Sequence, residues 1–280
     1  MTQPPFSSPE SPIPSPKNMD PALRAAASGM MAQQTRSEVI ANNLANVNTT
    51  AFKRSRAHFE DLLYQTVQGS TVVGAPDANS LPAIQVGRGT RLAGVERAHQ
   101  QGPLEQTERP LDLAIEGDGF FQLQMPNGQV GYTRDGSFAL SDTGTIVTSE
   151  GYTLIPGVKI PEDATDIAIS SSGVVSVTRG SDKTTTEIGR IELARFMNPT
   201  GLLAQGQNVY SETPASGAAV VGYPSEDGMG RLLQGNLEGS NVEIVQEMVD
   251  MITSMRAYEI NSKAIKNAEE MMSIANGMIR

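Results

Sequence analysis

Apolar residues recur at every seventh position over residues 241–280, the last part of the chain. The segment contains no proline, and Gly277 is its one glycine, so its composition does not interrupt a helix before the end. This period predicts one long helix, capped by Ser240 or Asn241, that packs in a left-handed coiled coil. An ordinary core helix is the alternative. The recurring residues are Ile244, Met251, Tyr258, Ile265, Met272 and Ile279, and Met248 and Met255 form a second row early in the segment.

A second helical pattern covers residues 21–46. Asp20 precedes it as a natural N-cap, and Pro21 suits the first helical position because its missing N–H is not needed there. The helix would bury little area of its own, so we expect it to need a helical partner, and the C-terminal helix is the candidate. Its thin apolar stripe consists of Leu23, Ala27, Met30, Ala41 and Leu44.

The middle of the chain alternates short apolar runs with turn signals, which is typical of antiparallel β-structure. In the run "FFQLQM", Phe121, Leu123 and Met125 share one face, because side chains alternate across a strand. We expect a compact β domain over residues 97–223 that is built as a meander, in which consecutive strands pair. The turn signals are Asn127-Gly128, Asp135-Gly136, Thr143-Gly144 and Glu150-Gly151.

Segments without a helical or strand period join these elements. Residues 1–18 are rich in proline and serine, which predicts a disordered leader, and Met19 is an alternative start. The predicted fold class is α+β, in which long N- and C-terminal helices form a coiled-coil core and the central domain is antiparallel and β-rich. The predicted order is leader 1–18, N-terminal helix with an Asn-rich junction 19–58, extended connector 59–96, β domain 97–223, Gly-rich connector 224–240 and C-terminal coiled-coil helix 241–280.

The composition excludes several classes of protein. A net charge of -10 over 280 residues argues against nucleic acid or an anionic membrane as the main partner. No apolar run approaches the roughly 18 residues that cross a bilayer, and no signal-peptide pattern opens the chain. We therefore expect no nucleic-acid partner and no membrane insertion. The chain has no cysteine, which excludes disulfides and thiolate metal sites, and its two histidines are His58 and His99.

Short acidic motifs in the chain do not match the pattern of a catalytic or metal-binding site. The turns "GDG", "RDG" and "SDTG" lack the full ligand pattern of a calcium loop, and ordinary turns explain them. Asp112, Glu116 and Asp118 cluster, but beside a strand that ends at a turn rather than across the cleft that a glycosidase needs. We expect no enzyme activity, no cofactor, and no catalytic, cofactor-binding or metal-binding residues.

Three separated regions carry a resemblance to a known family. They are "IANNLANVNTTAFKR" near the start, "EGDGFF" and "YTRDGSF" in the middle, and "LEGSNVEIVQEMVDMITSMRAYEINSKAI" near the end. In this order they resemble the bacterial flagellar rod and hook family. Within it, "FEDLLYQT" and the run from Val86 to Phe121 resemble the distal rod branch. The chain departs from the family pattern in its Pro-rich leader and at Ala51, where many members have glycine.

The resemblance implies a structural subunit of the basal-body distal rod, which self-assembles into a hollow helical tube and transmits motor torque to the hook. It also implies unfolded export through the flagellar type III export apparatus without signal cleavage, and assembly in the periplasm. The implied partners are copies of the chain, proximal rod and hook-type subunits at the tube ends, and P- and L-ring proteins around the rod.

Two alternatives stand beside this interpretation. The first is a proximal rod or hook subunit of the same family. The second, from another class, is a secreted polysaccharide-binding adhesin or enzyme whose helices form an oligomerisation stalk. Two helical ends that both lack an internal partner favour the assembling subunit over the stalk.

Four asparagines between residues 42 and 48 mark the end of the first helix. In an assembly their amides would satisfy backbone groups where one subunit's helix ends against another's, whereas in a monomer they would only end the helix. Phe52 would bury its ring, and Lys53 and Arg54 would pair with carboxylates of the assembly. The predicted subunit-interface residues are Leu23, Met30, Leu44, Asn42, Asn43, Asn46, Asn48, Phe52, Ile244, Met248, Met251, Met255, Tyr258, Ile265, Met272 and Ile279.

Overall fold

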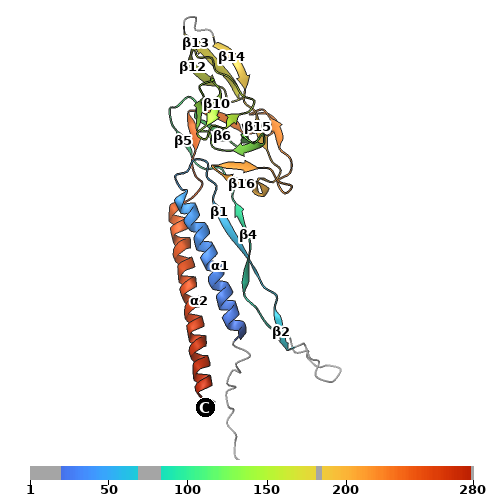
Figure 1. The fold of residues 1–280 in the computed structure, drawn as a ribbon, viewed down its shortest axis with the longest axis vertical. Helices are drawn as coiled ribbons and strands as arrows, with labels where there is room; N and C mark the ends of the chain where they lie inside the picture. The colour runs from blue at the N-terminus through green and yellow to red at the C-terminus, as the bar shows by residue number, and fades with distance from the viewer. Residues whose placement is uncertain (1–19, 69–82, 181–184, 279–280) are drawn as a thin grey trace, which may run out of the picture. The chain divides into compact units, whose positions relative to one another are not determined.

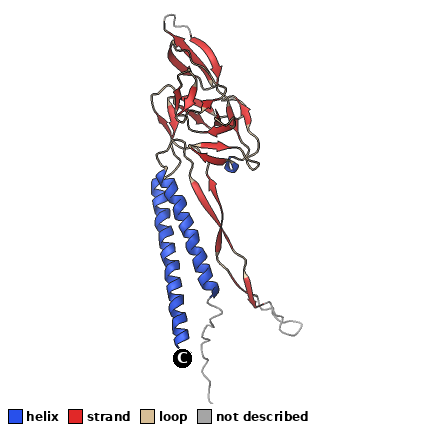
Figure 2. Ribbon diagram, viewed as in Figure 1, coloured by secondary structure: helices blue, strands red, loops and turns tan. Residues whose placement is uncertain are grey.

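The structure is a computed structural model that describes residues 20–68, 83–180 and 185–278. The chain forms two compact units, each built from segments far apart in the sequence. The first unit comprises Met1–Ile40, Ala57–Val95 and Met248–Arg280, and the second comprises Ala41–Arg56 and Glu96–Glu247. Figures 1 and 2 show one helix near each end of the chain and strands between them. The predicted leader lies outside the described residues.

Two helices supply most of the first unit. Helix α1 runs over Asp20–Ala45, and α2 runs over Ile244–Met278. Because its 35 residues contain no proline, α2 continues without a break for about 52 Å at 1.5 Å per residue. Within the unit, a Cβ atom added at Gly29 of α1 would lie 2.9 Å from the Asn261 side-chain nitrogen of α2, so the Asn261 side chain packs against the backbone of α1 there.

The predicted coiled-coil core is wrong. The apolar heptad row does not interlock with α1: Ile244 is 46% exposed, Tyr258 is 45% exposed, and Met248 and Met255 are each 53% exposed. Small residues of α2 are buried instead, among them Ser254 and Ala268. The coarser assignment, α+β with a helix near each end and a β-rich middle, fits the structure.

A second row of period seven explains this error. Glu247, Ser254, Asn261 and Ala268 also recur every seventh residue, and they carry polar or small side chains. The Ser254 hydroxyl donates to the Gln33 carbonyl oxygen at 3.0 Å and lies 3.0 Å from the Ser37 hydroxyl. Small and polar side chains therefore make the contact with α1, and a coiled coil needs large apolar side chains there.

A long hairpin completes the first unit. Strand β1 (Ser55–Asp61) pairs with β4 (Thr90–Arg97), and β2 (Gln65–Gln68) pairs with β3 (Ile84–Val86). The Thr90 N–H donates to the Ser28 hydroxyl at 3.2 Å. Gly89 has φ +107°, and a Cβ there would lie 2.1 Å from the same hydroxyl. The run of small residues at 25–29 therefore lets both α2 and the hairpin approach α1 within this unit.

A nine-stranded antiparallel sheet dominates the second unit. The predicted simple meander is only partly correct, because β8 pairs with β7 and β17 and does not pair with β9. After β8 the chain passes so near Leu113 that a Cβ at Gly136 would lie 1.6 Å from the Leu113 carbonyl oxygen. The strands along the sheet are β16 (Leu203–Gly206), β17 (Val209–Ser211), β8 (Val130–Thr133), β7 (Phe120–Gln124), β11 (Thr153–Leu154), β10 (Ile146–Thr148) and β9 (Phe138–Leu140), with β15 (Leu193–Arg195) beside β7 and β18 (Val220–Gly222) beside β15.

Strand β7 separates two apolar clusters of the second unit. Phe121, Leu123 and Met125 point into the larger cluster, which confirms the face predicted from the sequence. Phe120 points the other way, into a smaller cluster, so β7 is buried on both faces at its start. The smaller cluster consists of Phe120, Tyr132, Ala194, Phe196, Leu202 and Tyr210.

Shorter sheets complete the second unit. Strands β12 (Ala164–Ile169), β13 (Val174–Arg179) and β14 (Thr185–Arg190) form an antiparallel sheet of three. Strand β6 (Leu113–Glu116) pairs with β19 (Arg231–Gln234), and a 3-10 turn, η2, covers Pro199–Gly201. Strand β5 (Leu104–Gln106) pairs with β20 (Asn236–Glu238), which ends at a buried glutamate.

Candidate functional site

The asparagine-rich stretch forms the end of α1 in the second unit. The Asn46 N–H donates to the carbonyl oxygens of Asn42 and Asn43, each at 3.2 Å, and its side-chain amide donates to the Asn42 carbonyl oxygen at 2.8 Å. The turn that follows ends at Ala51, which has φ +55°, a left-handed conformation that alanine rarely adopts. The Ala51 N–H donates to the Glu238 carbonyl oxygen at 2.7 Å, which holds this turn against β20.

Asn43 connects the helix end to two other segments. Its side-chain oxygen accepts from the Ser55 N–H at 2.9 Å, and its side-chain nitrogen donates to the Ser55 carbonyl oxygen at 2.9 Å. The same nitrogen lies 3.2 Å from the Glu247 carboxylate, which also pairs with the Arg54 guanidinium. Asn43 and Glu247 are each 1% exposed, so this amide belongs to the interior of the chain.

A buried ion network lies beside this connection. Glu238 accepts from the Lys53 ammonium at 2.5 Å and from the Arg134 guanidinium at 2.9 Å. The Gly102 N–H also donates to Glu238 at 2.9 Å, and Lys53 donates to the Gln100 carbonyl oxygen at 2.7 Å. The side chains of Lys53 and Glu238 are fully buried. Each charge has several partners, which a buried ion pair needs to offset its loss of hydration.

The charges around Glu238 keep it ionised. Burial alone would raise the pKa of this carboxyl, but the positive charges of Arg134 and Lys53 outweigh burial and lower its pKa below the ordinary value. The Arg134 guanidinium is fixed in turn, because it donates to the carbonyl oxygens of Gly117 and Gly119 at 2.9 and 3.1 Å. The network therefore joins five segments of the chain.

Asn241 holds the start of the C-terminal segment in place. The sequence suggested it as a helix cap, but α2 begins three residues later, at Ile244. Its side-chain oxygen accepts from the Arg54 N–H at 2.7 Å, and its nitrogen donates to the carbonyl oxygens of Ala98 and Gln100 at 2.9 and 3.0 Å. Asn241 therefore bridges two segments and does not cap the helix.

His99 is packed between aromatic rings next to the ion network. Its ring meets those of Phe120 and Tyr210 edge-on, with centroids 5.8 and 5.5 Å apart. Burial, and then the nearby positive charges of Lys53 and Arg134, lower the pKa of His99 from 6.5 to about 4. The ring is therefore neutral at pH 7, and its buried Nδ1 has no hydrogen-bond partner within the described part of the chain.

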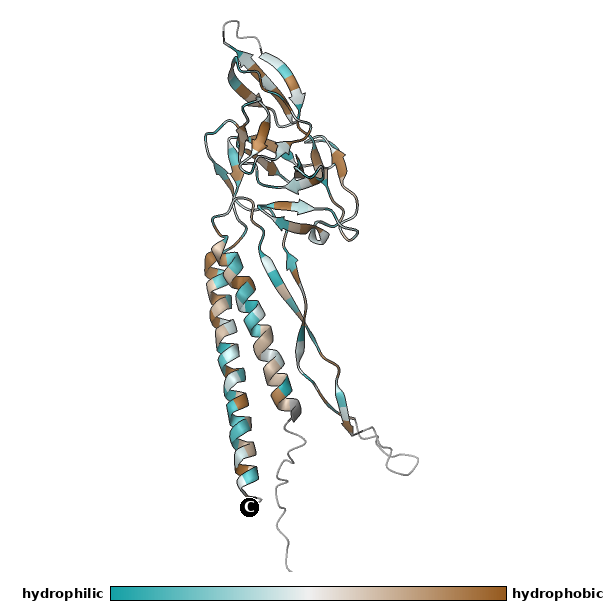
Figure 3. Ribbon diagram, viewed as in Figure 1, coloured by the Kyte–Doolittle hydropathy of each residue, from teal (hydrophilic) through white to brown (hydrophobic). Residues whose placement is uncertain are grey.

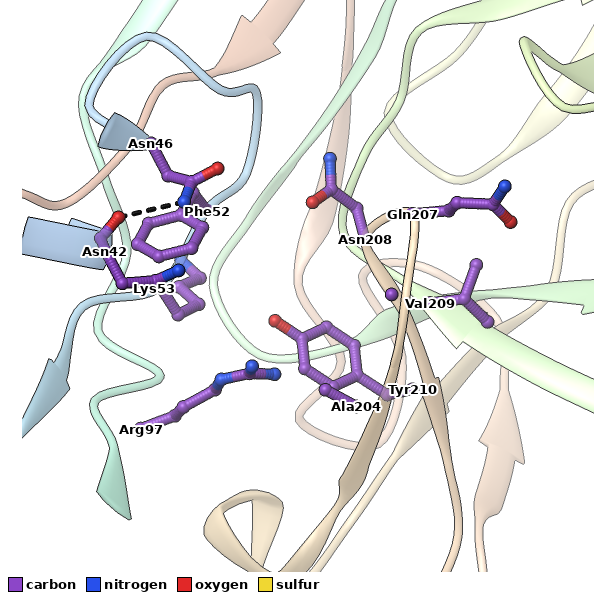
Figure 4. Close-up of a pocket in the computed structure, with 11 residues that line it drawn as sticks. Asn42, Asn46, Phe52, Lys53, Arg97, Ala204, Gln207, Asn208, Val209 and Tyr210 are labelled. Atoms are coloured by element: carbon purple, nitrogen blue, oxygen red, sulfur yellow. Dashed lines mark hydrogen bonds between the residues drawn. The ribbon is translucent and has the colours of Figure 1, made fainter. Parts of the chain in front are cut away.

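A cavity of about 200 Å³ opens next to these residues (Figure 4). Three segments of the second unit line it: the end of α1 with the turn after it, the end of β4, and the hairpin formed by β16 and β17. Phe52 lines the cavity and is half-buried. The labelled residues in Figure 4 are Asn42, Asn46, Phe52, Lys53, Arg97, Ala204, Gln207, Asn208, Val209 and Tyr210.

The structure separates the predicted interface residues into three groups. Asn43 is buried, and Leu23, Met30, Leu44, Asn46, Phe52, Met251, Ile265 and Met272 are half-buried. Ile279 lies outside the described residues. Asn42, Asn48, Ile244, Met248, Met255 and Tyr258 are exposed.

Further apolar residues of α2 that the heptad row did not include are also exposed. Val245 is 71% exposed and Ile260 is 66% exposed, and Figure 3 shows apolar residues near both ends of the helix. The sequence did contain a signal for this exposed surface, since several of these apolar residues are adjacent in the sequence to a residue of the predicted heptad row. The other members of this group are Val249, Ile252, Met271, Ile274 and Met278.

The sequence did not indicate the buried carboxylates. Lys53 and Arg54 were expected to pair with carboxylates of the assembly, but Glu238 and Glu247 of the same chain pair with them. In the described residues, no group of three or more His, Asp or Glu side chains is placed to hold a metal ion. None of the helices among the described residues is long and apolar enough to cross a membrane.

Three family models match the chain. The model described as "Flagella basal body rod protein" matches residues 23–53. The model described as "Flagellar hook protein FlgE/F/G D1 domain" matches residues 114–177. The model described as "Flagellar basal body rod FlgEFG protein C-terminal" matches residues 233–278. These matches include both helices and part of the β-rich unit.

Curated proteins resemble nearly the whole chain. The flagellar basal-body rod protein FlgG of Borreliella burgdorferi is 48% identical over 92% of this chain and 98% of its own length. The protein of the same name from Caulobacter vibrioides is 49% identical over 90% of this chain and 96% of its own length. The flagellar basal-body rod protein FlgF of the same Caulobacter strain is 33% identical over 90% of this chain and 95% of its own length.

Proposed function

Since the chain belongs to the flagellar basal-body rod protein family, in its FlgG branch, and is a structural subunit of the distal rod, we propose that its copies assemble side by side through the apolar residues that α2 exposes. The resemblance suggested by the sequence is confirmed by these relatives. The higher identity to FlgG than to FlgF of one organism, 49% against 33%, supports the distal rod over a neighbouring rod position.

The observation that carries this proposal is the exposed apolar surface of α2. A soluble monomer rarely exposes so many large apolar side chains on one element, and such surfaces mark contacts with other proteins. Burial of this surface would contribute roughly 25 cal/mol per Å². The exposed residues are Ile244, Val245, Met248, Val249, Ile252, Met255, Tyr258, Ile260, Met271, Ile274 and Met278.

The wider proposal follows from the family. We propose a hollow tube of these subunits in the periplasm that transmits torque to the hook, with no enzymatic reaction. Each chain would be exported unfolded through the type III apparatus without signal cleavage. The tube would meet proximal rod and hook-type subunits at its ends and the P- and L-ring proteins around it. The absence of cysteine suits a chain that passes unfolded into an oxidising compartment.

The predicted interface residues near the end of α1 remain part of this proposal. Asn42 and Asn48 are exposed and Phe52 is half-buried, so they are accessible to a neighbouring copy. Asn43 has its amide satisfied inside the chain, and its contribution to assembly would be to hold the helix end in position.

Replacement of one exposed residue tests the proposal. Ile252 is 51% exposed, so Ile252→Asp should leave the thermal unfolding of the monomer unchanged and prevent rod formation, because the contact between copies would bury an unpaired carboxylate. The matched control is Asn267→Asp, which adds the same charge at an exposed polar position of α2. The measurements are swimming motility, electron microscopy of isolated basal bodies and monomer melting. Normal rods in Ile252→Asp cells would contradict the proposal.

A further inference from the structure

The cavity of Figure 4 is lined without any acidic side chain. Its lining includes Arg97 and the polar residues Asn42 and Asn208. Asn208 is engaged inside the chain, since its side-chain nitrogen donates to the Thr50 carbonyl oxygen at 3.1 Å. Asn42 is exposed, and its side-chain amide has no hydrogen-bond partner among the described residues. The cavity therefore offers an unused amide beside a cation.

Arg97 is the accessible cation of this cavity. Its guanidinium carbon lies 5.7 Å from the centroid of the Tyr210 ring, a distance typical of a cation–π contact. Within the described ranges 20–68, 83–180 and 185–278, no carboxylate lies within ion-pairing distance of Arg97. The contact with Tyr210 fixes the guanidinium but leaves its charge uncompensated.

Other charges near the cavity leave a positive excess. Lys53, which also lines the cavity, shares the Glu238 carboxylate with Arg134, and the Asp135 carboxylate accepts from the Asn208 side-chain nitrogen at 3.3 Å. Together with Arg97 this group has three cations and two anions. His99 does not add a charge at pH 7, because its pKa is lowered to about 4 by burial. An anion that enters the cavity would meet this positive excess at the protein surface, where the attraction between charges is stronger than in bulk solvent.

We propose that a carboxylate side chain of a second copy of this chain enters the cavity and pairs with Arg97. The chain has a net charge of -10, so each copy presents a surplus of acidic side chains to its neighbours. A cavity of about 200 Å³ has room for such a side chain, since roughly 10–15 Å³ on the same measure is enough for one water. Arginine pairs with carboxylates through two parallel hydrogen bonds, which also fixes the angle between partners. The inference rests on the proposed assembly of copies, but its site is separate from the apolar residues of α2.

Charge reversal gives the first test. Arg97→Glu should abolish or strongly reduce rod formation and motility, because two carboxylates would then face each other. The same variant should lower the melting temperature of the monomer only slightly, since the interaction that Arg97 loses within its own chain is the contact with Tyr210. The matched control is Arg179→Glu, which reverses an exposed arginine in the same unit and should leave rods unchanged. Normal rods with Arg97→Glu would overturn the pairing.

Cross-linking gives the second test and identifies the partner. Arg97→Lys should keep the attraction and supply a primary amine, which a carbodiimide joins to a carboxylate in direct contact. Tubes would be assembled from equal amounts of unlabelled and ¹⁵N-labelled Arg97→Lys chains, treated, and analysed by mass spectrometry. We expect a mixed-isotope link between position 97 and an Asp or Glu of another copy, absent from monomers.

Two outcomes separate this inference from the proposed function. Tubes that form normally but give no mixed-isotope link at position 97, or a link only within one copy, would overturn the pairing and leave the structural role intact. Wild-type chains that form no tube would overturn the structural role, and the pairing with it.

Discussion

The two units of the chain place their apolar residues in opposite ways. In the second unit, large apolar side chains such as Phe121, Leu123 and Leu193 are fully buried. In the first unit, the contact between α1 and α2 uses Ser254, Asn261 and other small or polar residues, while most of the large apolar side chains of α2 are exposed. The second unit has a core of its own, whereas α2 in the first unit leaves most of its large apolar side chains exposed.

This difference indicates where the stability of each unit originates. Hydrophobic burial is the dominant favourable contribution to folding, and a helix without it is marginal in water. The second unit adds a buried ion network to its apolar clusters. The free energy of unfolding should therefore respond strongly to changes in the second unit and weakly to changes on the exposed face of α2.

The largest expected effect comes from the buried carboxylate. Glu238→Gln removes the one anion shared by Lys53 and Arg134, which leaves two buried cations without a counter-charge. The free energy of unfolding should fall by about 3–5 kcal/mol in urea titrations. The control is Glu105→Gln on the neighbouring strand, where the side chain is exposed and the change should be within about 0.5 kcal/mol. A loss below about 1 kcal/mol for Glu238→Gln would show that the network adds little to stability.

One pair of alanine substitutions compares the two units directly. Leu193→Ala removes a side chain that is 0% exposed and should lower the free energy of unfolding by about 2–5 kcal/mol. Ile252→Ala truncates a side chain that is 51% exposed, and it should change the free energy of unfolding by less than about 1 kcal/mol. The measurement is urea unfolding of both variants as monomers. Equal losses in the free energy of unfolding would mean that Ile252 is already packed in the monomer. The two units would then not differ in how they bury apolar side chains.

Acid should destabilise the second unit through His99. Its pKa is about 4 in the folded chain and 6.5 when unperturbed, so the unfolded chain binds an extra proton between these values. Stability from this group is therefore complete above pH 6.5 and falls as pH drops towards 4, by up to about 3 kcal/mol. The measurement is the free energy of unfolding between pH 7 and 4.5 for the wild type and for His99→Gln, which should have the shallower slope. Parallel slopes would show that His99 is solvated.

The smallest expected effect concerns the turn after α1. Ala51 has φ +55°, which is unfavourable for a residue with a Cβ atom and free of strain for glycine. Ala51→Gly should therefore raise the free energy of unfolding by about 0.5–1 kcal/mol, in spite of the greater freedom of glycine in the unfolded chain. Ala41→Gly, inside the exposed face of α1, should lower it by about 1 kcal/mol. Destabilisation by both substitutions would contradict the strain at Ala51.

Local patterns predicted the two helices and the buried face of one strand. The absence of proline after residue 241 and the predicted capping residue Asp20 indicated the two helices, and the alternation around Phe121 indicated which face of β7 is buried. The coiled-coil core was wrong because a period of seven shows that a helix has a repeated face but does not say what covers it. The small residues of the other row were the signal for the contact with α1.

The site could be predicted only in part, because its partners are distant in the sequence. Asn43 and Glu247 are 204 residues apart, and Lys53 and Glu238 are 185 residues apart. The sequence indicated that the asparagine stretch has a role beyond an ordinary helix end, and Asn43 does bond to two other segments. It could not indicate which carboxylates are buried, since Glu238 and Glu247 look like ordinary surface residues. Because Glu247 lies off the apolar heptad row of α2, the sequence alone would suggest that a substitution there has little effect.

The distance between these partners also sets the order in which the chain can fold. A chain that is synthesised or delivered from its N-terminus presents Lys53 early and Glu238 late, and closing so long a loop is slow and entropically unfavourable. Until Glu238 arrives, the lysine lacks the carboxylate that its burial requires, so the interior around it stays hydrated and open. Only a chain that extends at least as far as Glu238 can therefore close the ion network. A chain truncated before Glu238 would leave this region open, and locally open regions are more susceptible to proteolysis.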